Sequence, residues 1–123
     1  MKRFTWTTRI CVLAAKSEVN ALSVQPHGGH ADEVETSRMI HIAPHAVRID
    51  PACPALAGAD RVGALTRIPD LGGIHSPTGA WGDPTLANAV KGARFCDLMF
   101  QAILGDVDRL RDPEFLPLPE RQI

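Results

Sequence analysis

The strongest helical signal in the chain lies in residues 82–104, GDPTLANAVKGARFCDLMFQAIL. The opening Gly82-Asp83-Pro84 predicts a helix start, because Asp83 can accept hydrogen bonds from free backbone N–H groups and proline suits the first helical position. Apolar residues then recur at helical spacing, which predicts a helix from Pro84 to about Leu110. We expect its apolar face to contain Leu86, Ala89, Val90, Ala93, Cys96, Met99 or Phe100, Ile103 and Leu104, with Asn88, Lys91, Arg94 and Asp97 mostly off that face.

A second helical signal follows the turn at residues 25–29, where a proline and paired glycines interrupt regular structure. Acidic side chains gather near the positive end of a helix that we expect to run to about Ala43, and Pro44 closes it. The acidic residues are Asp32, Glu33 and Glu35, and the expected apolar face contains Val34, Met39, Ile40 and Ala43.

The rest of the chain is less regular. Residues 4–13 are rich in β-branched and aromatic side chains, which predicts a strand leading into a weak helix over 14–22. Residues 46–80 read as a long irregular connection with a short strand near Ile74, and a segment of this kind is usually functional or packed against a partner. We divide the chain into an atypical N-terminal segment (1–26), a main portion (27–112) and an extended proline-rich tail (113–123).

The composition limits the classes of protein to which this chain can belong. The 123 residues are enough for one domain, and 45% hydrophobic with 22% charged residues is typical of a globular chain. A net charge of −1 without a block of like charge argues against nucleic-acid binding, and no apolar run is long enough to span a membrane. Three widely spaced cysteines (Cys11, Cys53 and Cys96), and no clear secretory signal, predict a reduced, cytoplasmic chain with buried thiols.

The richest chemical cluster lies in residues 27–35. His30 stands where a glycine-rich turn enters the helix, and an imidazole there is suited to general acid–base work. Glu35 could orient His30 or serve a metal, although acidic residues at a helix start often only cap it. The i, i+4 pair His41 and His45 is interrupted by Pro44, so we expect no metal pair there. We expect His75 to be a loop residue.

Two motifs carry a resemblance to a known family. Residues 29–37, Gly-His-Ala-Asp-Glu-Val-Glu-Thr-Ser, contain the pattern H-A-x-x-x-E-T-S and lead to Ala43-Pro44. Residues 79–92 follow the pattern G-x-x-G-D-P-x-x-A-x-x-x-K-G. These two motifs, in this order, resemble motifs of the creatininase (creatinine amidohydrolase) family, and the resemblance covers roughly residues 27–110.

The resemblance implies an α/β fold, part of a three-layer creatininase-like architecture, with a long irregular connection and a long C-terminal helix. It implies oligomers and two divalent metal ions, zinc or manganese, that activate water to hydrolyse C–N bonds of cyclic amides or related small molecules. The catalytic histidine of the motif, a proton donor to the departing nitrogen, corresponds to His30, and Glu35 corresponds to a second motif position that supports the site.

The sequence also departs from the family pattern. The Glu-x-His pair and the other principal metal ligands of the family's first half are absent, so the metal-ligating residues of this chain are unknown. We expect a truncated, C-terminal half that is inactive when isolated, binds no metal or shares one, and exposes the apolar face of its last helix. It would pair with copies of itself or with a complementing N-terminal half. The alternatives are a non-catalytic remnant or interaction subunit, and a small metal-binding or regulatory module unrelated to this family.

Overall fold

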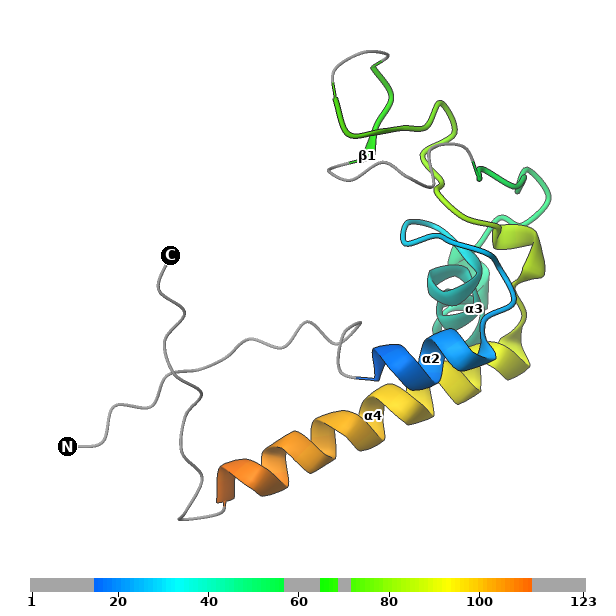
Figure 1. The fold of residues 1–123 in the computed structure, drawn as a ribbon. Helices are drawn as coiled ribbons and strands as arrows, with labels where there is room; N and C mark the ends of the chain where they lie inside the picture. The colour runs from blue at the N-terminus through cyan, green and yellow to red at the C-terminus, as the bar shows by residue number, and fades with distance from the viewer. Residues whose placement is uncertain (1–14, 57–64, 69–71, 112–123) are drawn as a thin grey trace.

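The computed structural model describes residues 15–56, 65–68 and 72–111, and Figure 1 shows how their helices are arranged. The strand expected in residues 4–13 and the tail 113–123 lie outside these residues. The described elements, in chain order, are α2 (Lys16–Leu22), α3 (Glu33–Ile42), the 3₁₀ turn η1 (Pro44–Ala46), β1 (Leu65–Thr66), β2 (Ile74–His75), the 3₁₀ turn η2 (Pro84–Leu86) and α4 (Ala89–Arg111).

Helix α3 begins and ends where the sequence predicts. The Asp32 carboxylate accepts a hydrogen bond from the Glu35 backbone N–H at 2.9 Å and so caps the first turn. The last turn closes with the Ala43 N–H donating to Met39 O, and Pro44 then opens η1. The predicted apolar face is only partly right, since Val34 packs against the core but Met39 does not. The fully buried residues of α3 are Glu33 and Ser37, while Met39 is 43% exposed.

Helix α4 begins five residues later than predicted. Asp83 accepts a hydrogen bond from the Thr85 N–H and caps only the short turn η2. Asn88 then provides a second cap, because its Oδ1 accepts from the Lys91 N–H at 2.9 Å. Two capping residues in succession divide the expected single helix into a 3₁₀ turn and an α-helix that runs from Ala89 to Arg111.

The two long helices cross at Gly92. A Cβ atom on Gly92 would lie 2.0 Å from the backbone oxygen of Ser37, so the α3 and α4 backbones are almost in contact there. The Ser37 hydroxyl is fully buried beside this crossing and accepts a hydrogen bond from the Asn88 N–H at 3.2 Å. The glycine therefore fixes which face of α4 is turned toward α3.

The hydrophobic core forms where α2 and α3 both lie on the first half of α4 (Figure 1). Its buried residues are Ala15, Val19, Phe95 and Met99, and Val34, Leu98 and Ala102 pack against them. The predicted apolar face of α4 was therefore rotated from the true one. Val90 is 81% exposed, whereas Phe95, which the pattern left out, is fully buried. The orientation of α4 is set by its crossing with α3 at Gly92, and the spacing of apolar residues along the helix carries no information about that crossing.

A small sheet lies in the long connection. Strands β1 and β2 pair in parallel, with Leu65 opposite Ile74 and Thr66 opposite His75, and the strand predicted near Ile74 is confirmed. Helices with a parallel sheet are compatible with the α/β class, while a three-layer arrangement stays a prediction. The prediction of buried thiols is wrong for Cys53, which is exposed. In the described ranges, no helix is long and apolar enough to cross a membrane.

The second half of α4 extends beyond α2 and α3 (Figure 1). Its apolar side chains Phe100, Leu104 and Val107 are exposed by 57%, 41% and 39%, respectively. These three residues, which we call the outer face of α4, recur at spacings of four and three and so share one side of the helix. The expected exposure of apolar surface on the last helix is therefore observed in this half.

Candidate functional site

His30 lies on a short backbone bridge between the two sequence motifs. The Trp81 N–H donates to His30 O at 2.7 Å, and the N–H groups of Gly29 and His30 donate to Trp81 O at 3.0 and 3.3 Å. The His30 side chain is exposed, and its ring centre lies 6.4 Å from that of Trp81. The turn before α3 therefore presents an accessible imidazole from a backbone that the second motif holds in place.

Glu35 stabilises the same turn from the other side. Its Oε2 accepts a hydrogen bond from the Ala31 N–H at 2.8 Å. Ala31 has a φ of +46°, a left-handed conformation that is unfavourable for alanine, so this carboxylate supports a strained residue next to His30. Among the described residues, the Glu35 carboxylate bonds the backbone and not the His30 imidazole. The structure thus brings His30 and Glu35 to one turn, with Glu35 acting on the backbone.

Two acidic residues at the start of α3 are buried, and Glu33, whose position in the sequence indicates only an acid at a helix start, is the more deeply buried of them. Its side chain is fully buried, and Oε2 accepts hydrogen bonds from the Ser23 hydroxyl and from the Val24 and Gln25 N–H groups at 2.8–2.9 Å. Oε1 pairs with the ammonium of Lys91 at 2.5 Å. One carboxylate therefore joins the turn after α2, the start of α3 and the first turn of α4.

The surroundings of Glu33 keep it ionised. Burial alone would raise its pKa, because a charge is poorly solvated inside a protein. The ammonium of Lys91 and the hydrogen bonds from Gln25, Ser23 and Val24 outweigh burial, so the pKa of Glu33 lies below its ordinary value. The sequence signal for this pair is slight, since the helical pattern places Lys91 off the apolar face. Only the contact between α3 and α4 shows that it turns toward a buried carboxylate.

Gln25 completes the connection between the two motifs. Its Nε2 donates to Asp32 Oδ2 at 2.7 Å, and its Oε1 accepts from the N–H groups of Glu33 and Asp83 at 3.1 and 3.0 Å. A Cβ on Gly28 would lie 2.6 Å from Gln25 Nε2. The close approach at this glycine is therefore made by the protein's own amide, which a side chain at position 28 would displace.

The described residues do not by themselves fit a metal centre. Asp32 and Glu33 already use their oxygens in hydrogen bonds, and His27 Nε2 lies 2.6 Å from Leu56 O. Across residues 15–56, 65–68 and 72–111, no group of three or more His, Cys, Asp or Glu side chains could hold an ion. The remaining histidines are dispersed: His41 is exposed in the last turn of α3, His45 is exposed in η1, and His75 is half-buried in β2.

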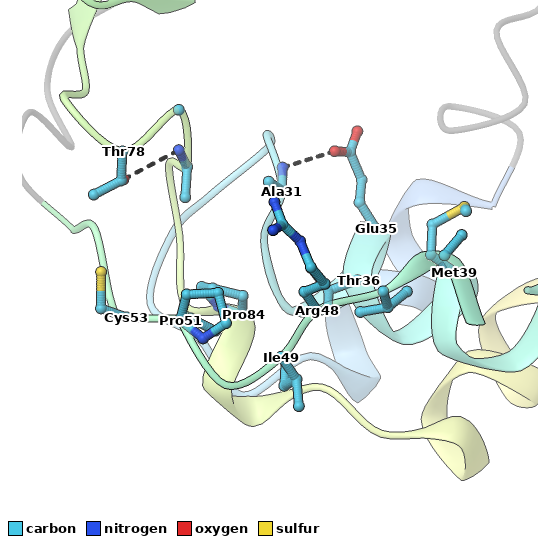
Figure 2. A pocket seen from close by; sticks show the side chains of 15 residues that line it. Ala31, Glu35, Thr36, Met39, Arg48, Ile49, Pro51, Cys53, Thr78 and Pro84 are labelled. Carbon is cyan, nitrogen blue, oxygen red and sulfur yellow. Dashed lines mark hydrogen bonds between the residues drawn. The ribbon is translucent and has the colours of Figure 1, made fainter. Parts of the chain in front are cut away.

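A cavity of about 500 Å³ lies beside Glu35, and Figure 2 shows the side chains that line it. Its walls come from α3, from the segment 46–53 and from the turn at residues 78–80, with Ala31 and Pro84. Most of the lining side chains are small and apolar, while Arg48 and Glu35 are its charged members. His30 is not among the lining residues, although its neighbour Ala31 is.

Comparison with known proteins decides the family. The family model for creatininase, described as creatinine amidohydrolase, matches residues 2–106. The chain belongs to the creatininase family. The match starts at residue 2, so it includes nearly all of the segment 1–26 that the sequence analysis set apart as atypical. No curated protein and no solved structure matches the chain significantly.

Membership in the creatininase family indicates an amidohydrolase type of activity and a small-molecule amide as substrate. Several motif residues of this family, as they stand in this chain, connect the first and second halves of the fold. Glu35 supports the turn, Ser37 and Gly92 form the helix crossing, and Lys91 neutralises the buried Glu33.

Proposed function

We propose that this chain supplies the proton-donating part of a metal-dependent amidohydrolase that hydrolyses C–N bonds in cyclic amides. The observation that carries the proposal is the geometry at His30. The imidazole is exposed, and its backbone is fixed by the bridge to Trp81 and by the support that Glu35 gives to Ala31. A side chain held on a fixed backbone and open to solvent can reach the nitrogen of a bound substrate.

In this proposal His30 donates a proton to the departing nitrogen as the C–N bond breaks. An imidazole is suited to this role because its ordinary pKa lies near neutral pH. Glu35 acts as a positioning residue through Ala31, because its carboxylate bonds the backbone of the turn. Removing either group would therefore affect catalysis by different routes, one chemical and one geometric.

The family resemblance implies zinc or manganese, which would supply an activated water when bound. The described donor set does not fit that centre, so its ligands would come from residues outside the described ranges or from another polypeptide. We propose either a homo-oligomer or a complementing N-terminal half as that partner, in the cytoplasm.

The test is metal content together with activity. Purified chain, alone and mixed with the N-terminal half of a creatininase-family enzyme, is analysed for bound zinc and manganese, and ring opening of creatinine is measured with each ion added. We expect His30→Ala to lower the rate by about 10²–10⁴-fold, the usual contribution of general acid–base catalysis. His45→Ala, which removes an exposed histidine of η1, is the matched control and should leave the rate unchanged. Equal losses in both variants, or hydrolysis that does not depend on His30, would contradict the proposal.

A second candidate is an interaction subunit of a creatininase-like assembly without catalysis of its own. The outer face of α4 favours it, because Phe100, Leu104 and Val107 present adjacent apolar surface. If the protein has the mass of a monomer in solution, and the double substitution Phe100→Ser and Leu104→Ser leaves this mass unchanged, the result would count against this candidate. Association that the double substitution abolishes, with no amide hydrolysis under any metal condition, would favour it over the enzyme.

A further inference from the structure

The cavity beside α3 has the size and the lining that are typical of a small-molecule binding site. Its volume of about 500 Å³ is within the range of natural ligand pockets, which are mostly apolar with a few polar groups. Val47, Ile49, Pro51 and Pro84 provide apolar wall, together with several alanines. All of its lining residues belong to the described part of the chain.

Arg48 is the positively charged residue among those that line this cavity. Figure 2 shows its side chain extending from the segment 46–53 toward the side where Ala31 and Glu35 lie. Within the described residues, its guanidinium makes no hydrogen bond and no ion pair, whereas Arg94, Arg109 and Arg111 each pair with an aspartate. A guanidinium offers five donors in a planar arrangement that matches a carboxylate with two parallel hydrogen bonds. An unpaired Arg48 over apolar walls is therefore suited to an anion with an apolar body.

Glu35 decides which anion fits. Its carboxylate lies on the same cavity and has one oxygen, Oε2, bonded to the Ala31 N–H. The negative charge of Glu35 opposes a second negative charge nearby, so a dianionic phosphate is disfavoured relative to a monoanion. Oε1 of Glu35 can in addition accept a hydrogen bond from a ligand N–H or O–H group.

We infer that the cavity lined by Arg48 and Glu35 binds small monocarboxylates with an apolar body, with the carboxylate held by Arg48. This inference goes beyond the proposed hydrolysis, because it concerns binding alone and involves neither His30 nor a metal ion. The chemistry is shared by simple aryl or alkyl carboxylic acids and by carboxylate-bearing amides.

The test compares three probes on the full chain by isothermal titration calorimetry. Phenylacetate carries the carboxylate, phenylacetamide is its neutral counterpart, and phenyl phosphate is the dianion. We expect phenylacetate to bind at least about tenfold more tightly than the other two, since a hydrogen-bonded charge pair contributes about that factor or more. Equal binding of phenylacetate and phenylacetamide, or no binding of phenylacetate, would overturn the inference.

Variants assign the effect to the guanidinium. Arg48→Gln should weaken phenylacetate binding about tenfold or more, and Arg48→Lys should restore part of it, because lysine retains the charge but not the paired donors. Arg94→Gln is the matched control: it removes the same charge from an exposed site on α4 that does not line the cavity. Phenylacetate binding that Arg48→Gln leaves unchanged would refute the assignment. Circular dichroism spectra establish that all three variants are folded.

The alkylation rate of Cys53 provides an independent measure of whether a ligand occupies the cavity. Its thiol is exposed and lines the same cavity, whereas Cys96 lies on α4 away from it. Bound phenylacetate should slow alkylation of Cys53 and leave the rate at Cys96 unchanged, as measured by mass spectrometry of the peptides. Protection of both thiols, or of neither, would contradict occupation of this cavity.

Discussion

The two halves of α4 share one helical sequence pattern but have different surroundings. In the first half, Gly92 touches the backbone of α3, Lys91 pairs with a buried carboxylate and Phe95 is fully buried. In the second half, the outer face of α4 is exposed, and the ion pairs Asp106–Arg109 and Asp108–Arg111 each join residues three positions apart on the helix. Local sequence therefore determines that α4 is a helix, while contacts with α2 and α3 determine which of its side chains stabilise the fold.

The largest expected difference between the halves is at two phenylalanines. Phe95→Ala should lower the free energy of unfolding by about 3–5 kcal/mol, because it leaves a cavity in the core. Phe100→Ala should change it by about 0.5 kcal/mol, since that side chain is 57% exposed. Urea unfolding followed by circular dichroism measures both values. Similar losses in the two variants would mean that the outer face of α4 is covered in solution.

A pair of glycines tests the helix crossing. Gly92→Ala should cost about 3 kcal/mol, since the added Cβ would overlap Ser37 O and force the helices apart. Gly105→Ala is the matched change in the second half, where a Cβ meets nothing within 4 Å, and it should increase stability by up to about 1 kcal/mol. Thermal unfolding separates the two results. A stable Gly92→Ala protein would disprove the close crossing.

Two ion pairs on α4 provide a smaller contrast. Lys91→Met should destabilise the fold by about 2 kcal/mol, because the fully buried Glu33 loses its counter-charge. Arg94→Met removes a pair with Asp97 in which both side chains are more than half exposed, and the expected loss is under about 1 kcal/mol. Equal values from chemical denaturation would indicate that water reaches Glu33 and screens its charge.

The pH dependence of stability tests the same carboxylate in the wild-type chain. The pKa of Glu33 is lower in the folded chain than in the unfolded one, so the unfolded state binds more protons between the two values. The stability from this group is therefore complete above the ordinary carboxyl pKa and is lost as pH falls through the lowered one. Urea unfolding from pH 7 to pH 3 should show a shallower decline for Glu33→Gln than for the wild type, while Asp97→Asn, at an exposed site, should follow the wild type.

Much of the local structure could be predicted from the sequence. The limits of α3, the stop at Pro44, the short strand at Ile74 and the end of α4 near residue 110 all follow from capping, proline and periodicity. The turn of His30 and Glu35 was also located correctly, because the motif is contiguous. What the motif could not show is that Glu35 bonds the backbone of Ala31.

The errors about which side chains of α3 and α4 are buried have one physical origin, which is the contact between distant segments. The periodic pattern included Val90 and left out Phe95, because the orientation of α4 depends on the close approach of Gly92 to Ser37. Glu33 looked like any acid at a helix start, and its burial depends on Lys91, 58 positions away in the chain. Arg48 is not predicted as a site residue, since an arginine in a connection has significance only beside the cavity that it lines.

The hydrogen bonds of Gln25 also have a consequence for chemical ageing of the protein. Slow deamidation converts a glutamine side chain to a carboxylate, which cannot donate a hydrogen bond. At Gln25 it would replace the donor that faces Asp32 with a second anionic oxygen at the same 2.7 Å separation. The two acids would then have to share a proton or move apart, and the turn that leads to His30 would lose its attachment to α3. Deamidation of Gln25 would therefore limit how long a purified preparation keeps the turn before His30 in its native geometry.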